Sequence, residues 1–257
     1  MTSAWQLILA SYPPEKRRWD RTFPWIYYGA RPLSFVLTWI ALRIRLTPNQ
    51  VTLLSFIVGV GAFVLMAWGD AGLVAGSCLF ALLNILDCVD GNLARMRRED
   101  SPLGKFYDAA VGLIFYLVYF ALGLGLYRTP DSSLSMVLAS LGVGTPPPIV
   151  YLLLGTAATL SRYLGLHLQG LFHGVLGSYW ERKKTGENMP LHRTRWYYRI
   201  YHNATDVQGQ DPILIVAAAT GLAGLYLALS AVIQVLNLAG LAVFYIRRAR
   251  ALGQNSR

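Results

Sequence analysis

Charged residues are scarce in this chain, and acidic residues are much rarer than basic ones. Only 14% of the 257 residues are charged, with 13 Asp and Glu against 23 Lys and Arg, while 54% are hydrophobic. This composition excludes an ordinary soluble domain and indicates several membrane-spanning segments. Two cysteines are too few for a disulfide framework, and on one helix Cys78 and Cys88 would lie about 15 Å apart. We therefore expect reduced thiols, and we expect no signal peptide because no cations precede the first apolar stretch.

Long apolar runs dominate the region from residue 49 to residue 250, which we predict to be one membrane domain. A membrane-spanning helix needs about 20 apolar residues, with about 17–25 tolerated. Four runs have this length, and the uncharged run 212–246 is long enough for two helices joined by a turn. The sequence therefore predicts an all-α integral membrane protein with a six-helix transmembrane bundle. The predicted spans are 51–68, 72–95, 106–127, 149–172 and two within 212–246.

Four other segments are predicted to lie outside these spans. Residues 1–48 form N-terminal cytosolic and interfacial helices, and within them 31–45 mix apolar residues with arginines as an amphipathic helix on the inner leaflet does. Residues 134–143 are apolar but too short to span, which indicates an outer loop or a re-entrant turn. Residues 177–211 form a cytosolic loop rich in aromatic and basic residues. Attachment to anionic lipid headgroups is the simpler interpretation of this loop, and substrate contact is the alternative.

Basic residues are concentrated between the apolar runs on one side of the predicted membrane. If both termini lie inside, 21 of the 23 Lys and Arg residues are cytoplasmic, Arg128 lies outside and Arg162 lies within a span. This asymmetry follows the positive-inside rule. We therefore expect a multi-pass protein with both termini and its site cytoplasmic, in the inner membrane if the source is bacterial. Anionic membrane lipids, and not nucleic acid, are the expected partners of these cations.

Three helix starts are marked by a capping residue followed by proline. Thr47, Ser101 and Asp211 each precede a proline. Residues of these types favour the N-cap, and proline favours the first helical position. The sequence therefore predicts three helix starts, all at cytoplasmic ends of spans.

Three of the few carboxylates cluster where apolar runs meet the predicted cytoplasmic side. Asp87 and Asp90 belong to the sequence DCVDGNLAR at 87–95, and Asp108 begins the next span. An ionised group at the centre of a bilayer helix costs about 2.5–3.5 kcal/mol on insertion scales, so such groups indicate function. Helical geometry gathers these acids and small residues on two faces. The first face carries Asp87, Asp90, Gly91 and Ala94, and the second carries Gly104 and Asp108.

Two acidic faces of this kind suit a divalent cation that holds a diphosphate. Mg²⁺ or Mn²⁺ binds oxygen ligands, and Mg²⁺ commonly uses one or two carboxylates together with substrate phosphates. Glycines let a nucleotide approach the backbone closely, and nearby cations would lie beside its phosphates. Simple pairing of the acids with interfacial arginines is the alternative. The predicted metal ligands are Asp87, Asp90 and Asp108, and the predicted neighbours of the nucleotide and its phosphates are Gly91, Gly104, Arg95, Arg97, Arg98 and Lys105.

The spacing of these residues resembles the signature of the CDP-alcohol phosphotransferases, also called CDP-alcohol phosphatidyltransferases. Seven positions match the pattern D-x2-D-G-x2-A-R-x8-G-x3-D over 87–108, and LTPNQVT at 46–52 resembles the start of the family's first span. The resemblance covers residues 31–125. It implies six helices around a cytosol-facing cavity, divalent metal, an acceptor hydroxyl that displaces CMP, and a homodimer. The site residues carried over are Asp87, Asp90, Gly91, Ala94, Arg95, Gly104 and Asp108.

One position departs from the family pattern. The signature ends with a fourth aspartate, taken as the general base, and this chain has Gly112 at that position. Glycine cannot accept a proton, and loss of a general base costs about 10²–10⁴-fold in rate. Three explanations stay open: an acceptor that is already ionised, a base from elsewhere, or nucleotide binding without turnover. The candidates for a base elsewhere are His167, His173, His202, Asp206 and Asp211, and the sequence assigns none of them.

The sequence thus predicts a membrane transferase of phospholipid or related polar-lipid biosynthesis. It would move a phosphatidyl or phospho-polyol group from a CDP-linked donor to an alcohol or phosphorylated acceptor and release CMP. A catalytically silent CDP-binding paralogue that scaffolds or regulates a partner is one alternative, and a small cation transporter is another. Arg162 has two interpretations, contact with an anionic acceptor or lipid phosphate and snorkelling to an interface.

Overall fold

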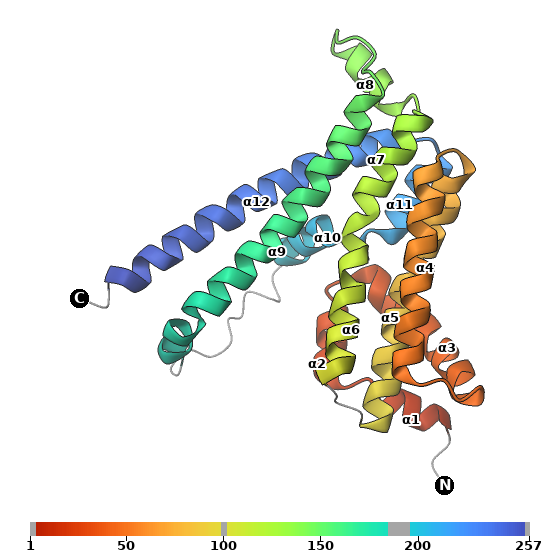
Figure 1. Ribbon diagram of the computed structural model, residues 1–257, viewed down its shortest axis with the longest axis vertical. Coiled ribbons are helices and arrows are strands. Elements are labelled where there is room, and N and C mark those ends of the chain that lie inside the picture. Colours follow the sequence, from red (N-terminus) through yellow and green to blue (C-terminus); the bar gives the residue numbers. More distant parts are fainter. Residues whose placement is uncertain (1–3, 99–101, 185–195, 255–257) are drawn as a thin grey trace.

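The computed structural model describes residues 4–98, 102–184 and 196–254 (Figure 1). In these ranges the chain is helical and has no strand, as predicted for an all-α protein. In chain order the elements are α1 (Ala4–Ala10), α2 (Pro14–Asp20), the π-helical turn η1 (Ile26–Ala30), α3 (Arg31–Arg43), α4 (Pro48–Trp68), α5 (Ala71–Arg97), α6 (Pro102–Gly112), the 3-10 segment η2 (Leu113–Leu117), α7 (Val118–Arg128), α8 (Ser133–Ser140), α9 (Ile149–Lys184), α10 (Trp196–Thr205), the 3-10 turn η4 (Val207–Gly209), α11 (Asp211–Ala219) and α12 (Ala223–Gln254).

Five helices of the described chain are long and apolar enough to cross a membrane. Four of them confirm the first four predicted spans, the third being continuous through α6, η2 and α7. A chain with several such helices is a multi-pass membrane protein. The five segments are Pro48–Trp68, Ala71–Arg97, Pro102–Arg128, Ile149–Val175 and Ala223–Ala251.

The six-helix bundle is not confirmed, because residues 212–246 do not divide into two spans. α11 has nine residues, which is about 14 Å of helix and too short to cross a bilayer. It ends at Ala219, and the chain turns at Gly221, whose φ is 70°. α12 then continues for 32 residues. The turn falls near the start of the apolar run, so one short and one long helix form in place of two equal ones.

The bundle is built outward from an antiparallel pair. α4 and α5 are joined through Gly69 and Asp70, both with positive φ. α7 packs on α4, α9 packs on α7, and α12 runs along α9. α9 and α12 lean away from the α4–α5–α6 group towards the lower left of Figure 1. The core between these helices includes Ala62, Met66, Phe80, Leu83, Ile114, Phe115, Val118, Tyr119, Leu122 and Tyr151.

Of the three predicted helix caps, one is confirmed and one is wrong. Thr47 forms a capping box: its hydroxyl accepts the Gln50 backbone N–H at 3.3 Å, and the Gln50 side chain accepts the Thr47 N–H at 2.9 Å. Ser101 lies outside the described residues. Asp211 does not cap α11, because Gln210 is the N-cap residue and the Asp211 carboxylate accepts hydrogen bonds from other helices.

The third span changes its pitch directly after Gly112. A 3-10 segment in the middle of a helix often marks a hinge or strain. Two side chains of α9 satisfy carbonyls of this segment. The Tyr163 hydroxyl donates to the Leu113 carbonyl at 2.7 Å, and the Thr159 hydroxyl donates to the Tyr116 carbonyl at 3.3 Å. The fourth span thereby supports the third where its α-helical pitch is lost.

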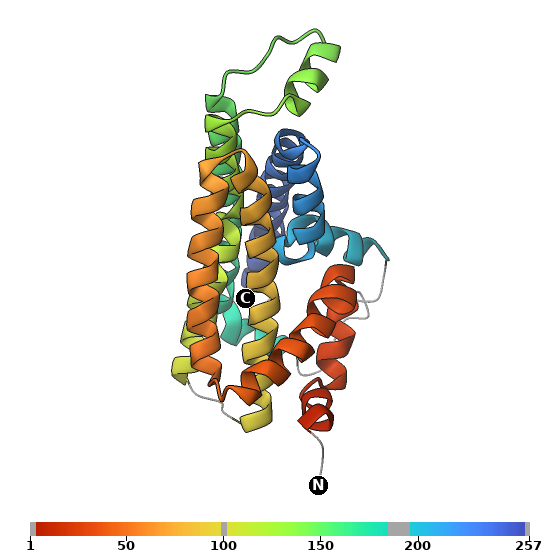
Figure 2. The same cartoon turned by 90° about the vertical axis from the view of Figure 1, so that its right-hand side faces the viewer.

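The N-terminal helices pack beside the lower end of α5 (Figure 2). α3 corresponds to the helix predicted at 31–45, and its inward face is polar, with Ser34 and Thr38 fully buried. Its outward face is apolar, with Trp39 and Ile40 exposed. Apolar side chains on the outer face suit a helix at a membrane surface. Its position on the inner leaflet stays a prediction.

The remaining predicted segments are short helices where they are described. α8 has eight residues, so residues 134–143 do not form a span, as predicted. In the predicted loop 177–211, α9 continues to Lys184 and α10 and η4 cover most of 196–209, while 185–195 lie outside the described residues. Cys78 is exposed and Cys88 is buried, and both are free thiols as expected.

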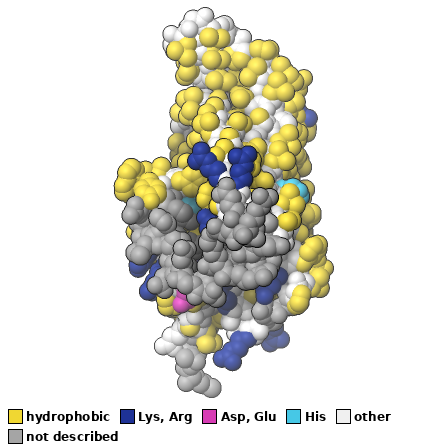
Figure 3. Space-filling view, turned by 90° about the vertical axis from the view of Figure 1, so that its left-hand side faces the viewer, with side chains coloured by type: hydrophobic (Ala, Val, Ile, Leu, Met, Phe, Trp, Pro, Cys, Tyr) yellow, Lys and Arg dark blue, Asp and Glu magenta, His cyan; other side chains and the backbone are white. Residues whose placement is uncertain are grey.

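Charged side chains are unevenly distributed along the molecule. On the face shown in Figure 3, the upper part is mostly hydrophobic and most visible Lys and Arg side chains lie in the middle and lower parts. The lower part is also where α5 meets α6 (Figure 1). Positive charge therefore gathers at the same end of the bundle as the acidic residues of these two helices.

Close packing of α7 on α9 gives a test of the fold. A Cβ added at Gly155 would lie 2.5 Å from the Tyr119 carbonyl oxygen and 3.0 Å from the Gly123 Cα. We expect Gly155→Leu to lower the free energy of unfolding by about 1–3 kcal/mol through overpacking, measured as a lower thermal midpoint in detergent. Gly170→Leu on the same helix is the control, since a Cβ there meets no atom within 4 Å. Equal midpoints for the two variants would contradict this packing.

Candidate active site

A cavity of about 630 Å³ lies between α4, α5, α6 and the N-terminal helices, and we call it the signature cavity. Every residue of the predicted signature lines it, because the lower end of α5 faces α6 across it. Residues separated by three or four positions share one helix face, so each helix presents its acids and small residues together. The signature residues on its wall are Asp87, Asp90, Gly91, Ala94, Arg95, Gly104 and Asp108.

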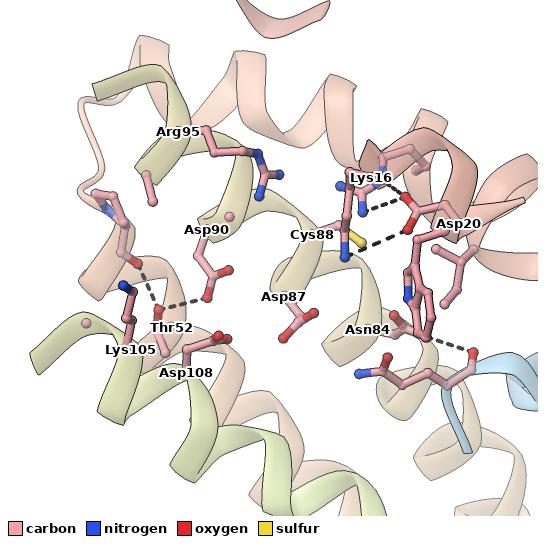
Figure 4. A pocket seen from close by; sticks show the side chains of 18 of the residues that line it. Lys16, Asp20, Thr52, Asn84, Asp87, Cys88, Asp90, Arg95, Lys105 and Asp108 are labelled. Atoms are coloured by element: carbon pink, nitrogen blue, oxygen red, sulfur yellow. Dashed lines mark hydrogen bonds and ion pairs between the residues drawn. The ribbon is translucent and has the colours of Figure 1, made fainter. Parts of the chain in front are cut away.

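The three carboxylates enter this cavity from two helices. Figure 4 shows Asp87 and Asp90 on α5 and Asp108 on α6, with their side chains directed into the space between the helices. Asp87 and Asp108 are close enough to interact electrostatically. No three His, Cys, Asp or Glu side chains within the described ranges already stand in metal-binding proximity. The oxygen donors fit the chemistry of Mg²⁺. Their roles as metal ligands stay a prediction.

Asp90 is held in place by a residue of the first span. The Thr52 hydroxyl lies 2.7 Å from Asp90 Oδ2 and 3.1 Å from the Pro48 carbonyl oxygen. Both Thr52 and Asp90 are buried, so the hydroxyl compensates part of the cost of removing the carboxylate from water. The sequence analysis included Thr52 in the family-like start of α4 but gave it no role. The one hint of such a role in the sequence is that Thr52 is a polar residue within an apolar span, one helical turn after Pro48.

The predicted phosphate-binding cations separate into two groups. Arg98 and Lys105 line the signature cavity, as Arg95 does. Arg97 is not among the residues of this wall and donates to the Leu46 carbonyl at 2.6 Å, so its place beside a phosphate stays a prediction. Arg95 is partly engaged elsewhere, because its Nε donates to the Ser11 carbonyl at 2.7 Å. Arg95 therefore ties the N-terminal segment to α5 as well as facing the cavity.

The N-terminal helices supply a wall of the cavity that the sequence analysis missed. Arg31 is 2% exposed, and two of its nitrogens lie 2.8 Å from Asp20 Oδ2. A third nitrogen donates to the Asn92 side chain on α5 at 3.3 Å. The Arg31 guanidinium also lies 4.9 Å from the centre of the Tyr12 ring. Burial, followed by the charge of Asp20, raises the pKa of Tyr12 well above its ordinary value, which keeps its hydroxyl neutral.

This wall was hard to recognise in the sequence. Only the rarity of acids in the first 48 residues, Glu15 and Asp20, marked a special position there. Removing one partner from a buried ion pair leaves an uncompensated charge, so Asp20 and Arg31 depend on each other. Nothing in the sequence shows that two residues 11 positions apart pair beneath α5.

A polar cluster closes the cavity at its inner end. Asn84 on α5 donates to the Gln208 carbonyl at 2.9 Å and to Asp211 Oδ2 at 3.0 Å. The Trp25 indole N–H donates to the same Asp211 oxygen at 3.1 Å. Asn84 and Gln208 line the signature cavity, and Asp211 does not. The carboxylate of Asp211 thus joins α5, η1 and the start of α11 behind the cavity.

None of the five candidate bases lines the signature cavity. Asp211 is the buried acceptor just described, and Asp206 caps the following turn by accepting the Gln208 N–H at 3.3 Å. The His202 ring lies 6.1 Å from that of Trp19 and 6.2 Å from that of Phe23. The other two histidines lie on α9: His167 lines a separate apolar groove, and His173 packs on aromatic rings. A base from these residues would need a rearrangement of their elements.

Gly112 is one helical turn from Asp108, and the space beside it is open. A Cβ built at Gly112 meets no atom within 4 Å, so no described side chain fills the place of the absent aspartate. Arg162 lies nearby on α9, with its guanidinium 5.0 Å from the centre of the Tyr116 ring. Its buried Nε has no hydrogen-bond partner among the described residues. Arg162 therefore faces an aromatic ring and is not part of the cavity wall.

Comparison with known proteins finds a family model and curated relatives that each match part of this chain. Residues 45–168 match the model of the CDP-alcohol phosphatidyltransferase family. An archaetidylinositol phosphate synthase of Aeropyrum pernix is 38% identical over 95 residues, which is 37% of this chain and 47% of the relative. A bifunctional IPC transferase and DIPP synthase of Rubrobacter xylanophilus is 44% identical over 66 residues, 26% of this chain and 15% of the relative.

A third relative is the inner membrane protein YnjF of Escherichia coli, 40% identical over 73 residues, or 28% of this chain and 33% of the relative. The chain thus spans less than half the length of each of these relatives. The family model covers the first three spans and most of the fourth, together with every signature residue of the cavity. Residues 45–168, slightly less than half of the chain, are thus similar to the CDP-alcohol phosphatidyltransferase family.

Proposed function

We propose that this protein is a membrane transferase that moves a phospho-alcohol group from a CDP-linked donor to an acceptor alcohol and releases CMP. The observation that carries the proposal is the signature cavity, which gathers all seven signature residues although they come from two helices. The match of residues 45–168 to the CDP-alcohol phosphatidyltransferase family model supports the same reaction class. The donor is a CDP-linked lipid or a CDP-linked polyol, and the acceptor is an alcohol or a phosphorylated alcohol.

Different residues of the cavity would bind the metal and the phosphates. Asp87, Asp90 and Asp108 present carboxylate oxygens to one space, which fits Mg²⁺ or Mn²⁺. When bound, such a cation neutralises the diphosphate and the charge that develops on the leaving phosphate. Arg98 and Lys105 add positive charge at the junction of α5 and α6, where the phosphates would lie.

Small residues leave room for the nucleotide. Gly91, Ala94 and Gly104 line the cavity with little or no side chain. A Cβ at Gly91 would lie 3.1 Å from a terminal nitrogen of Arg95, so glycine keeps space between this guanidinium and the helix. A cytidine group could therefore approach both helices closely.

The absent base limits which acceptor can react. No described histidine occurs on the cavity wall, and the acids there are the three proposed metal ligands and Asp20. The Asp20 carboxylate is engaged in an ion pair with Arg31. Two versions of the proposal remain: an active enzyme whose acceptor is already ionised, or a CDP-binding paralogue without turnover. Gly112 and the open space beside it support the two versions equally.

We further propose the setting of the reaction. Both termini and the signature cavity face the cytoplasm, in keeping with the gathering of cations at this end of the molecule. Anionic lipids contact these cations, and residues 1–48, 49–250 and 177–211 keep their predicted roles as interfacial segment, membrane domain and cytosolic segment. A homodimer is part of the family expectation and belongs to the proposal.

Substitution of the α6 acid tests the proposed chemistry. We expect Asp108→Asn to lower CMP release from CDP-linked donors at least about 100-fold, because even outer-shell partners of metal ligands contribute about 10–100-fold. The same variant should lose Mg²⁺-dependent binding of CDP, measured by titration in detergent. Asp70→Asn, at the turn between α4 and α5 far from the cavity, is the matched control. Equal CDP binding by wild type and Asp108→Asn would refute the proposed site.

Substitutions at Gly112 distinguish the active version of the proposal from the silent one. We expect Gly112→Asp to fit without a clash and, in a silent protein, to raise CMP release with neutral alcohols by about tenfold or more, since a general base contributes about 10²–10⁴-fold. Gly112→Asn is nearly the same size but cannot act as a base, so it should give no gain. Substantial wild-type turnover, unchanged by Gly112→Asp, would instead identify the active version with an ionised acceptor.

A further inference from the structure

α6 is the least buried part of the third span, although it carries two residues of the signature. Val111 is buried, but every side chain from Lys105 to Ala110 is exposed, including that of Asp108. The main packing of α6 is with α4 and with its own continuation η2. Across the signature cavity, Asp90 of α5 is buried. One wall of the cavity is therefore fixed inside the bundle, and the opposite wall is a peripheral helix.

The segment that follows α6 is firmly held by the rest of the bundle. Ile114 and Phe115 of η2 belong to the hydrophobic core, and most residues of α7 after them are buried. The Tyr163 hydroxyl of α9 also donates to the Leu113 carbonyl at 2.7 Å, where the α-helical pitch is lost. α6 thus extends from an anchored segment towards the lower end of the molecule (Figure 1).

Gly112 lies at the junction between the exposed helix and the anchored segment. Glycine has more backbone freedom than any other residue, and it weakens a helix relative to alanine. A Cβ at Gly112 meets no atom of the described chain within 4 Å, so packing does not require glycine at this position. A change to 3-10 pitch within a helix, which occurs directly after Gly112, often marks a hinge. Gly112 therefore has the properties of a pivot between α6 and η2.

A cation controls how favourable it is for α6 to approach α5. Asp87 and Asp108 already lie close enough to interact electrostatically. Closer approach in the absence of a cation brings like charges together and removes the exposed Asp108 from water, and both changes cost free energy. A divalent cation between the carboxylates makes the same approach favourable. A diphosphate would add an attraction to Lys105, which lines the cavity from the same helix.

We propose that α6 is an arm that pivots at Gly112 and closes the signature cavity when a divalent cation and the CDP diphosphate bind. This inference rests on the proposed function for its ligands, and it gives Gly112 a role besides the absence of a general base. Closure brings Asp108 onto the cation and excludes water from the diphosphate. Water would otherwise compete with the acceptor alcohol, because a CDP-linked donor can be hydrolysed as well as transferred.

Distances between spin labels on the full-length protein in detergent test the closure. The labels are attached to keto amino acids introduced at the exposed positions Leu103 of α6 and Arg18 of α2, because these two helices line opposite sides of the cavity (Figure 4). We expect Mg²⁺ with CDP to shorten this distance by at least about 2 Å, the scale of a rearrangement. The control pair joins Arg18 to the exposed Ala75 of α5 and should keep its distance. An unchanged α6 distance in the CDP-bound protein, or an equal change in both pairs, would overturn the proposal.

Gly112→Ala tests the pivot. Alanine fits without a clash and favours the helical backbone that Gly112 has in the structure, so it should oppose bending at this position. We expect a narrower distance distribution without ligand and Mg²⁺-dependent CDP binding that is about two- to fivefold weaker. Gly170→Ala on α9 is the matched control, since a Cβ there also meets no atom within 4 Å. Equal distributions and equal affinities for the two variants would refute a pivot at Gly112.

The same samples distinguish the closure from the proposed function. Titration with CDP and Mg²⁺ reports on binding at the signature residues, and the label distance reports on α6. If CDP binds and the α6 distance does not change, the closure fails and the proposed transferase stands. If CDP does not bind, the proposed function fails together with closure on CDP, while a ligand-free distribution that Gly112→Ala narrows would still support the pivot.

Discussion

The placing of Asp87, Asp90 and Asp108 on two apolar helices is the constraint on which the signature cavity depends. Asp90 is buried, and a buried carboxylate is costly unless nearby groups compensate its charge and its loss of water. Thr52 satisfies one oxygen of Asp90, and cations at the junction of α5 and α6 lie on the same cavity wall. The three carboxylates still concentrate negative charge in the cavity, which a divalent cation would neutralise.

The N-terminal helices are a second consequence of this buried polar site. An apolar segment packed over α5 would leave the side-chain nitrogen of Asn92 without partners, and α3 instead turns a polar face inward. The Asn92 side chain donates to Thr38 at 3.1 Å and to Ser34 at 3.3 Å, and it accepts from Arg31 and Arg95. Polar groups inside the protein thus hold the segment in place while its apolar side chains remain outside. A helix in a soluble protein usually buries its apolar face, whereas α3 buries its polar face. This arrangement is expected for a helix between a polar core and lipid.

The prediction of six spans was wrong because it depended on where the chain turns, and the sequence does not determine that position. The run 212–246 has enough apolar residues for two spans, yet the turn at Gly221 leaves α11 too short to cross. Hydropathy measures total apolar length, and it does not fix where a turn falls within an uncharged run. Helix packing also decided that Arg95 lies on the cavity wall while Arg97, two residues further along the helix, donates to the Leu46 carbonyl. It likewise decided that none of the five candidate bases lies on this wall.

The sequence by itself determined the helical class, four of the spans and the convergence of the signature residues on one cavity. Those features follow from local rules, since apolar length sets a span and helical periodicity sets a face. Only the tertiary structure decided that residues between Lys16 and Arg31 line that cavity, that Asp20 pairs with Arg31, and that Thr52 holds Asp90. These contacts join residues on different helices, and their geometry depends on how whole helices pack.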